Sequence, residues 1–193
     1  MSHLTPEDLY GLEEYAKIRN DFRAKVMVYK RDRKVHVGTN ATLYFEDRLT
    51  MQYQIQEMLR IERTFEPEGI AEELATYNPL IPDGRNWKAT FMVEYPDAEE
   101  RRAVLGKLIG IEDRVWVEVA GHEKVFAVAD EDLERADETK TSSVHFLRFE
   151  LTPKIVVAVK GGAALTVGID HSHYRQAVTV NDTTHAALVR DLD

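Results

Sequence analysis

Two closely spaced histidines are the best local candidates for a functional site in this sequence. They lie in the segment Asp170-His171-Ser172-His173-Tyr174, between two predicted strands. In an extended chain, side chains two residues apart point to the same side, so His171 and His173 could bind one ion. Imidazole combined with a carboxylate suits iron, zinc or manganese. A polar turn with incidental histidines is the alternative, because the sequence contains no HExxH motif and no complete His/Cys zinc set.

Glu94 and Glu150 are candidate acid–base residues or metal ligands. Each lies at the end of a predicted strand and directly before a predicted helix. Ligands gather at the carboxyl ends of strands in α/β proteins, and paired carboxylates can transfer protons or bind hard metal ions. The simpler alternative is that each side chain faces solvent or caps the helix that follows it.

Glu62 interrupts the apolar face of the strongest helical pattern in the chain, Glu46–Phe65. A carboxylate on such a face needs a partner, because its unpaired burial is costly. We expect a salt bridge to Arg148 or to one of Arg19 and Arg23. These last two lie four residues apart and could together bind an anion or a carboxylate. Metal ligation and acid–base chemistry are the alternatives. The apolar face consists of Met51, Ile55, Met58, Leu59 and Phe65.

The composition is that of a globular protein with an acidic surface. With 193 residues, 44% of them hydrophobic and 31% charged, the chain can bury a core without a metal or a disulfide. Its 34 acidic and 25 basic residues give a formal net charge of -9, which argues against a nucleic-acid partner. The one basic cluster, Lys30–Lys34, is short and contains an aspartate, and it is interpreted as a solvated helix end.

Several classes of protein are excluded by what the sequence lacks. It has no cysteine, which rules out disulfides, thiolate zinc sites and iron–sulfur ligation by this chain. It has no GxGxxG, GxxxxGK[ST] or GxSxG motif. No stretch approaches the ~18 apolar residues of a membrane span, and the N-terminus does not look like a secretion signal. We therefore expect a cytoplasmic protein without a membrane anchor.

The N-terminal part of the sequence predicts three helices and a strand or hairpin. Asp47 is the expected N-cap of the central helix, and Pro67 suits the first position of the third. Glu57 is placed on the polar flank of the central helix, with Arg60 as its partner. The predicted elements are a helix over Leu12–Arg31, alternating residues over Val35–Phe45, a helix within Glu46–Phe65 and a helix over Pro67–Tyr77.

The rest of the sequence repeats one order of elements twice. Phe91–Glu94 matches Leu147–Glu150, and Val117–Val119 matches Val167–Ile169, which favours duplication of a β-α-β-β unit over coincidence. The two units should pair about a pseudo-twofold axis. The first unit is predicted as a strand over Trp87–Tyr95, a helix from Asp97 to Gly110, strands over Val115–Val119 and Val125–Val128, and a short helix or loop over 130–138. The second is predicted as a strand over Val144–Leu151, a helix from Pro153 to Gly161, strands over Leu165–Ile169 and Gln176–Val180, and a last helix from Asn181 to Arg190.

These patterns predict one α+β domain over residues 1–193. Its parts are an N-terminal helix and strand region (1–84), a first β-α-β-β unit (85–140) and a second unit (141–193). The two units are expected to form a mixed sheet, with the N-terminal helices covering one face of it.

Several strings along the chain resemble the uncharacterised bacterial family DUF3501. The strings are Tyr53–Glu62, Ala89–Asp97, Ile111–Val117, Val144–Pro153 and Gly168–His171, which together sample nearly the whole chain. The resemblance implies a shared fold without an assigned activity, so the catalytic residues, if any, are unknown. It also implies a neighbourhood of rubrerythrin-like and iron–sulfur oxidoreductase genes.

The leading functional hypothesis is a non-enzymatic accessory protein in a bacterial redox or iron-related system. It would act through contacts with a protein partner or as a homo-oligomer, with exposed apolar residues beside the helix within Asp47–Phe65. The alternative is a metal-dependent enzyme or metal-binding protein that uses His171 and His173 with Glu62, Glu94 or Glu150. A third possibility is a small-molecule-binding module between the duplicated units.

Overall fold

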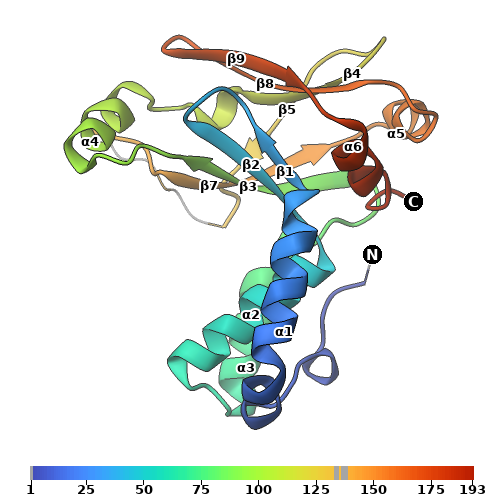
Figure 1. Ribbon diagram of the computed structural model, residues 1–193. Helices are drawn as coiled ribbons and strands as arrows, with labels where there is room; N and C mark the ends of the chain where they lie inside the picture. Colours follow the sequence, from blue (N-terminus) through green and yellow to red (C-terminus); the bar gives the residue numbers. More distant parts are fainter. Residues whose placement is uncertain (1, 133–134, 136–138) are drawn as a thin grey trace.

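The chain forms a bundle of three long helices below a head that contains two β-sheets (Figure 1). The computed structural model describes residues 2–132, 135 and 139–193, so part of the helix or loop expected over 130–138 lies outside the described residues. The α+β class predicted from the sequence is confirmed. Within the described residues, no helix is both long and apolar enough to cross a membrane.

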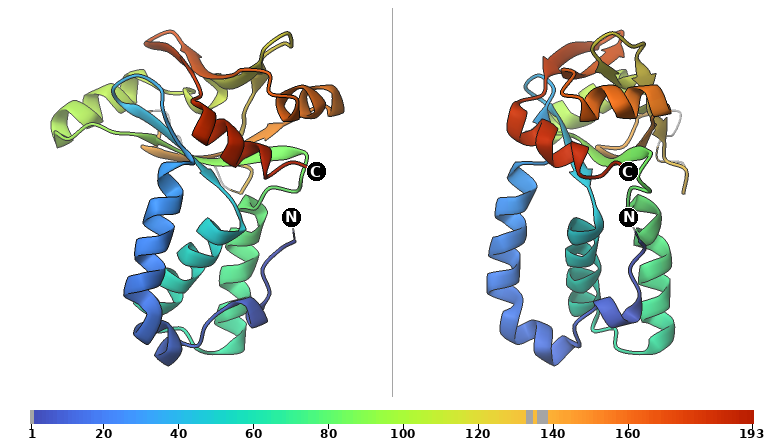
Figure 2. Two further views of the ribbon diagram at one scale, coloured as in Figure 1. Left: turned by 45° about the vertical axis from the view of Figure 1, so that its right-hand side comes forward. Right: turned by 90° about the vertical axis from the view of Figure 1, so that its right-hand side faces the viewer.

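The helical bundle is formed by α1 (Leu12–Arg31), α2 (Arg48–Glu62) and α3 (Pro67–Tyr77), with the short 3-10 helices η1 (Pro6–Asp8) and η2 (Asn78–Leu80) at its margins. The helices bury their apolar sides against one another and project away from the head, so they meet one face of a sheet with their ends and do not lie flat across it (Figure 2). The buried side chains at the centre of the bundle are Leu4, Met51, Ile55, Leu59, Leu74 and Ile81.

Local signals in the sequence set the ends of these helices. Asp47 is the N-cap of α2, where its side chain accepts a hydrogen bond from the Thr50 N–H at 2.9 Å. Arg63 ends the same helix in the left-handed conformation, with φ of 56°. Pro67 is the first residue of α3, where its missing N–H costs nothing.

The head contains two separate antiparallel sheets. The lower sheet has the strand order β1-β2-β3-β7-β6, and the upper sheet has the order β5-β4-β8-β9. The strands of the lower sheet are β1 (Lys34–His36), β2 (Ala41–Glu46), β3 (Asn86–Val93), β7 (Val144–Glu150) and β6 (Val128–Ala129). Those of the upper sheet are β5 (Val125–Phe126), β4 (Val115–Val119), β8 (Leu165–His171) and β9 (Tyr174–Thr179).

The expected mixed sheet is therefore wrong. In each repeat the helix connects a strand of the lower sheet to a strand of the upper sheet, so the connection does not produce parallel neighbours. The strand predicted over Val125–Val128 is likewise divided between the sheets. Its first half is β5 of the upper sheet, and the chain then passes to the lower sheet as β6.

The strand register gives the pseudo-twofold arrangement expected from the duplication. Aligning Phe91–Glu94 with Leu147–Glu150 makes Thr90 equivalent to Phe146, and these two residues are paired across the lower sheet. The second match makes Val117 equivalent to Val167, and this pair is formed in the upper sheet. A residue paired with its own equivalent lies beside a local axis, which runs between β3 and β7 in the lower sheet and between β4 and β8 in the upper sheet.

The main core lies between the two sheets. Alternate residues of the central strands point into it, including Phe91 and Leu147 from the lower sheet and Val117 and Val167 from the upper one. Three helices close its sides: α4 (Ala98–Lys107) at one end, and α5 (Pro153–Lys160) and α6 (Asp182–Val189) at the other (Figure 1). The lower sheet consequently has one face in this core and another directed toward the helical bundle.

Candidate functional site

A cavity of about 510 Å³ lies where the helical bundle meets the outer face of the lower sheet, and we call it the junction cavity. Its walls come from the ends of α1, α2 and α3 and from strands β2, β3 and β7. This volume is within the range of small-molecule sites in proteins. The apolar part of its lining consists of Met27, Met51, Leu80, Met92 and Phe146, with the rings of Tyr44 and Tyr77.

Among the described residues that line the junction cavity, Glu46 is the only acidic one. It is the last residue of β2 and is only 3% exposed. Its Oε1 accepts a hydrogen bond from the Thr90 hydroxyl at 2.7 Å. Its Oε2 receives no hydrogen bond from the described residues, and the nearest cation, Lys30 Nζ, lies 3.7 Å away. Because buried carboxylate oxygens are normally hydrogen-bonded, this atom is an unsatisfied acceptor in a residue of the cavity wall.

Three cationic side chains lie around the same cavity. They are Lys30 and Arg31 at the end of α1 and Lys34 at the start of β1. The Lys34 ammonium lies over the Tyr44 ring, 5.3 Å from its centre. Within the described part of the chain, neither Arg31 nor Lys34 forms an ion pair. The lining of the cavity therefore carries an excess of positive charge.

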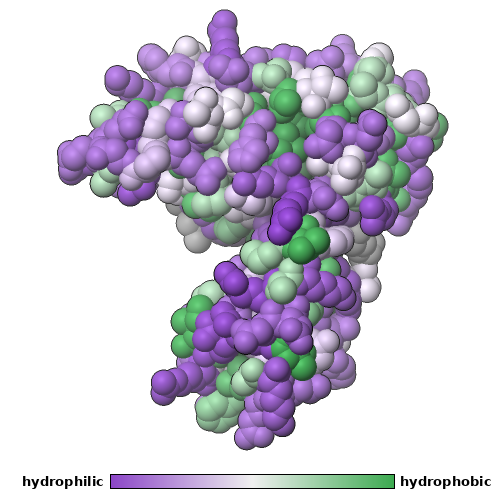
Figure 3. Space-filling model, viewed as in Figure 1, coloured by the Kyte–Doolittle hydropathy of each residue, from purple (hydrophilic) through white to green (hydrophobic). Residues whose placement is uncertain are grey.

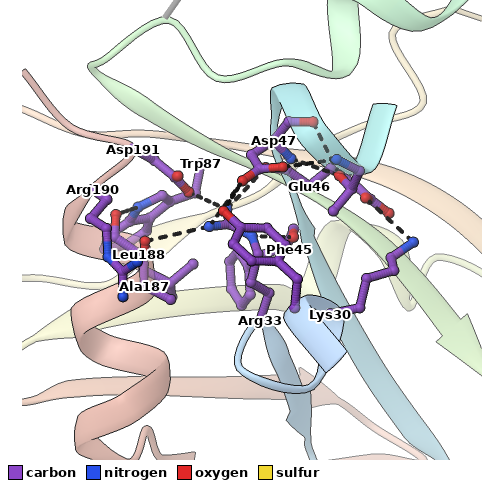
Figure 4. Close-up of polar contacts among 12 residues, drawn as sticks. Lys30, Arg33, Phe45, Glu46, Asp47, Trp87, Ala187, Leu188, Arg190 and Asp191 are labelled. Atoms are coloured by element: carbon purple, nitrogen blue, oxygen red, sulfur yellow. Dashed lines mark hydrogen bonds and ion pairs between the residues drawn. The ribbon is translucent and has the colours of Figure 1, made fainter. Parts of the chain in front are cut away.

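A buried polar network behind the cavity holds Glu46 in place (Figure 4). Arg33 donates from Nε to the Phe45 carbonyl oxygen at 2.9 Å and from Nη2 to the Glu46 carbonyl oxygen at 3.2 Å. The same guanidinium forms ion pairs with Asp47, at 3.5 Å, and with Asp191. This network joins the end of α1, the start of α2 and the C-terminal region, and so sets the geometry of the junction.

The two carboxylates of this network share one guanidinium. Burial raises the pKa of Asp191 to about 6, although Arg33 acts in the opposite direction. The Tyr29 hydroxyl donates to Asp47, and burial together with this carboxylate raises the pKa of Tyr29 to about 12. The network is therefore costly to ionise completely, and Oδ1 of Asp191 receives no hydrogen bond from the described residues.

The two candidate histidines have different surroundings. His171 is buried at the end of β8, where its Nε2 lies 3.2 Å from the Ile109 carbonyl oxygen. Its Nδ1 accepts a hydrogen bond from the backbone N–H of His173 at 3.2 Å. His173 is exposed in the turn before β9. The rings are 5.8 Å apart, but both nitrogens of His171 are occupied by backbone groups.

Glu94 and Glu150 are not brought together. Asn86 pairs with Glu150 and Met92 with Val144, so the ends of β3 and β7 point in opposite directions. About eight residues of strand separate the two carboxylates, on the order of 25 Å. Glu94 accepts a hydrogen bond from the Thr42 hydroxyl at 2.6 Å, and Glu150 forms an ion pair with Arg148 at 2.8 Å.

Glu62 does not meet an arginine of the described chain, contrary to expectation. It is exposed at the last residue of α2, while Glu57 is the carboxylate directed toward α1. Arg19 donates to both oxygens of Glu57, at 2.8 and 2.7 Å, and Arg60 lies 3.4 Å from the same carboxylate as expected. Arg23 is exposed and takes no part in this ion pair. Helix α2 is oriented so that Glu57, and not Glu62, faces α1.

The head contains a buried chain of polar side chains that was not predicted from the sequence. His145 Nδ1 lies 2.5 Å from Asp130 Oδ2, and its Nε2 lies 2.9 Å from Thr141 Oγ1. The order Thr141, His145, Asp130 resembles the nucleophile, base and acid of a catalytic triad. However, the Thr141 hydroxyl donates to Glu112 at 3.1 Å and the residue is only 1% exposed, so a substrate cannot reach it. The available signal was that His145, two residues before Leu147, shares the inward face of its strand.

Metal binding receives no geometric support from the described residues. Among them, no group of three or more histidine and carboxylate side chains is arranged to hold a metal ion. The junction cavity combines an apolar lining with a buried carboxylate oxygen of Glu46 that accepts no hydrogen bond from the described residues, and we take it as the candidate site.

Comparisons with known proteins agree with the whole-chain resemblance. The model of a family described as "Protein of unknown function (DUF3501)" matches residues 3–192. A crystal structure of a novel protein of unknown function from Burkholderia pseudomallei is 48% identical, covers 100% of both chains and superimposes with a TM-score of 0.95. Comparison with curated proteins gives no match.

Proposed function

Since this chain belongs to the DUF3501 family of proteins of unknown function, its relatives supply no activity, and we propose from its geometry that it is a non-enzymatic binding protein. Its ligand is a small organic molecule held in the junction cavity. The observation that carries this proposal is Glu46, a residue that lines the cavity and whose buried Oε2 receives no hydrogen bond from the described residues.

Three properties of the cavity support a ligand of this kind. A buried carboxylate oxygen without a hydrogen bond is costly, and a donor group on a ligand would recover that cost. Three methionines, Met27, Met51 and Met92, line the apolar part, and their flexible side chains adapt to the shape of a guest. Thr90 and the Arg33 network hold the Glu46 carboxylate and its backbone before any ligand arrives.

Titration with the neutral fluorescent probe N-phenylnaphthylamine tests this proposal. The probe has an apolar body that fits the cavity and one N–H group that can donate to Glu46. Met92→Trp fills the cavity from β3 and should weaken binding by at least about tenfold. Val157→Trp, on the exposed side of α5 and away from the cavity, should bind as the wild type does.

The comparison requires that both variants have the same urea unfolding midpoint as the wild type. Binding to the wild type should also raise its melting temperature, because a ligand that binds only the folded state stabilises it. If the probe does not bind the wild type, or binds Met92→Trp equally well, the proposal is wrong.

A second candidate function, an accessory role through protein contacts, is favoured by one observation. Ile61 and Phe65, at and just beyond the end of α2, are 62% and 70% exposed. Figure 3 shows hydrophobic residues on the outer surface of the helical bundle among mostly hydrophilic ones. A partner surface was expected from the sequence beside this helix, and large exposed apolar side chains there could contribute to one.

The partners implied by the family resemblance can be tested directly. Ile61→Ser with Phe65→Ser should abolish binding to a purified rubrerythrin-like or iron–sulfur oxidoreductase protein of the same bacterium, without loss of stability. Val157→Ser removes an equally exposed apolar side chain from the head and serves as the control. Sedimentation of the same variants tests a homo-oligomer. Unchanged partner binding and unchanged self-association would remove this candidate.

A further inference from the structure

We infer, on the basis of the proposed binding function, that the ligand of the junction cavity is an organic anion. Its charged group lies at the mouth of the cavity beside Arg31 and Lys34, and its apolar body extends inward toward Met92. This inference names the class of ligand, which the proposed function leaves open.

The charge of the lining favours an anion over a cation. The described lining contains three cations, Lys30, Arg31 and Lys34, and one acidic residue, Glu46, whereas the whole chain carries a formal net charge of -9. The cavity is therefore a local basic site on an acidic protein. A cationic ligand would have to approach Glu46 past three positive side chains, and the resulting repulsion would oppose its entry.

The positions of the cations match a charged group at the mouth. Lys30 already lies 3.7 Å from Glu46 Oε2, so its charge is directed inward. Arg31 and Lys34 have no ion-pair partner among the described residues, and the Lys34 ammonium lies over the ring of Tyr44, 5.3 Å from its centre. Cations at the end of α1 also complement the helix dipole, but Lys34 lies beyond that helix and in β1, where this explanation does not apply.

Two matched probes separate the charge of the ligand from its apolar body. Anilinonaphthalene sulfonate is N-phenylnaphthylamine with one added sulfonate, so the two share the same rings and the same N–H group. Fluorescence titration at low ionic strength should give a dissociation constant about tenfold lower for the sulfonate. This preference should shrink as salt is added, because salt screens charges at the surface.

Removal of the cations at the mouth should remove the preference for the sulfonate. Arg31→Ala with Lys34→Ala should bring the two dissociation constants to within about twofold of each other. Lys17→Ala with Lys25→Ala removes two exposed cations from α1 outside the cavity and should retain the tenfold preference.

The possible results distinguish this inference from the proposed function. Equal affinity of the wild type for both probes would overturn the anionic ligand and leave the binding function intact. A preference that survives in Arg31→Ala with Lys34→Ala would also overturn it. Failure of both probes to bind would overturn the proposed function itself.

Discussion

Arg33 and Asp191 lie 158 residues apart in the chain and form an ion pair that is almost completely buried. One residue follows α1 and the other follows α6, so the pair joins the helical bundle to the C-terminal part of the head. The same guanidinium donates to the carbonyl oxygen of Glu46, whose side chain lines the junction cavity. The pair is thus both a structural link and a support for the candidate site.

Replacement of Arg33 should destabilise the protein strongly. Arg33→Met leaves the carboxylates of Asp47 and Asp191 buried without their cation, which costs about 3–5 kcal/mol. Arg31→Met removes an exposed arginine two residues earlier and should change the free energy of unfolding by less than about 0.5 kcal/mol. Urea unfolding measures both. A loss below about 1 kcal/mol in Arg33→Met would contradict the role given to this network.

The same unfolding curves test the prediction of a single domain over residues 1–193. The bundle and the head have separate clusters of buried apolar residues, linked through the Arg33 network. If they form one cooperative unit, fluorescence of Trp87 and Trp116 in the head should follow the same transition as the loss of helical circular dichroism. Two separate transitions would divide the chain into two domains.

Asp191 should make the protein less stable as the pH rises toward neutrality. Its pKa is raised from 3.8 to about 6 by burial, so folding takes up a proton at this group. Its favourable contribution is present below the unfolded pKa and is lost as the pH rises through the folded pKa. The loss amounts to at most about 3 kcal/mol for this group. Unfolding free energies measured between about pH 4 and pH 7 should show this component in the wild type and not in Asp191→Asn. If the unfolding free energies of the wild type and Asp191→Asn change with pH in parallel, Asp191 does not titrate in this range.

Glu57 should make the protein less stable as the pH falls, which is the opposite pH dependence to that of Asp191. Its hydrogen bonds with Arg19, and then with Tyr15 and Arg60, lower its pKa from 4.5 to about 2. Its contribution is therefore present above the unfolded pKa and is lost as the pH falls through the folded pKa. Because the pair with Arg19 is partly solvated, we expect about 1 kcal/mol. Glu57→Gln should flatten the acid limb of the stability profile, whereas Glu62→Gln, at the exposed end of the same helix, should not.

The His171 geometry predicts that added metal ions do not stabilise this protein. Nδ1 accepts from the backbone N–H of His173, so Nε2 carries the proton and donates to Ile109, and neither nitrogen has a free lone pair. Thermal unfolding with iron, zinc or manganese should match that of chelated protein. His173→Ala, which removes an exposed ring, provides the control. One equivalent of bound metal, lost in His173→Ala, would establish the alternative metal site.

Local structure was predictable where short-range chemistry decides it. The N-cap at Asp47 and the start of α3 at Pro67 depend on residues within one helical turn. The α1 helix follows the periodic apolar residues that predict it, with the same bounds. The duplicated order of strands and helices was also readable, because alternation of apolar residues with period two marks each strand.

The candidate site was not predictable, because its residues come from distant parts of the chain. Glu46 was interpreted as the beginning of a helix, yet it ends β2 and lines the junction cavity with Lys30 and Phe146. The basic cluster Lys30–Lys34 was interpreted as a solvated helix end. Arg33 within it is in fact buried, and Lys30, Arg31 and Lys34 line the cavity. Each assignment depends on packing between elements that no local pattern specifies.

By itself, the sequence determined the helices, most strands, the caps and the twofold repetition, since these follow from interactions between residues close in the chain. Tertiary structure decided that the repeats form two antiparallel sheets and that Glu57, not Glu62, meets Arg19. It also decided that the end of β2 meets the end of α1 around a cavity. The physical reason is that a periodic pattern states which side of an element is apolar, whereas the identity of the surface packed against that side depends on the whole fold.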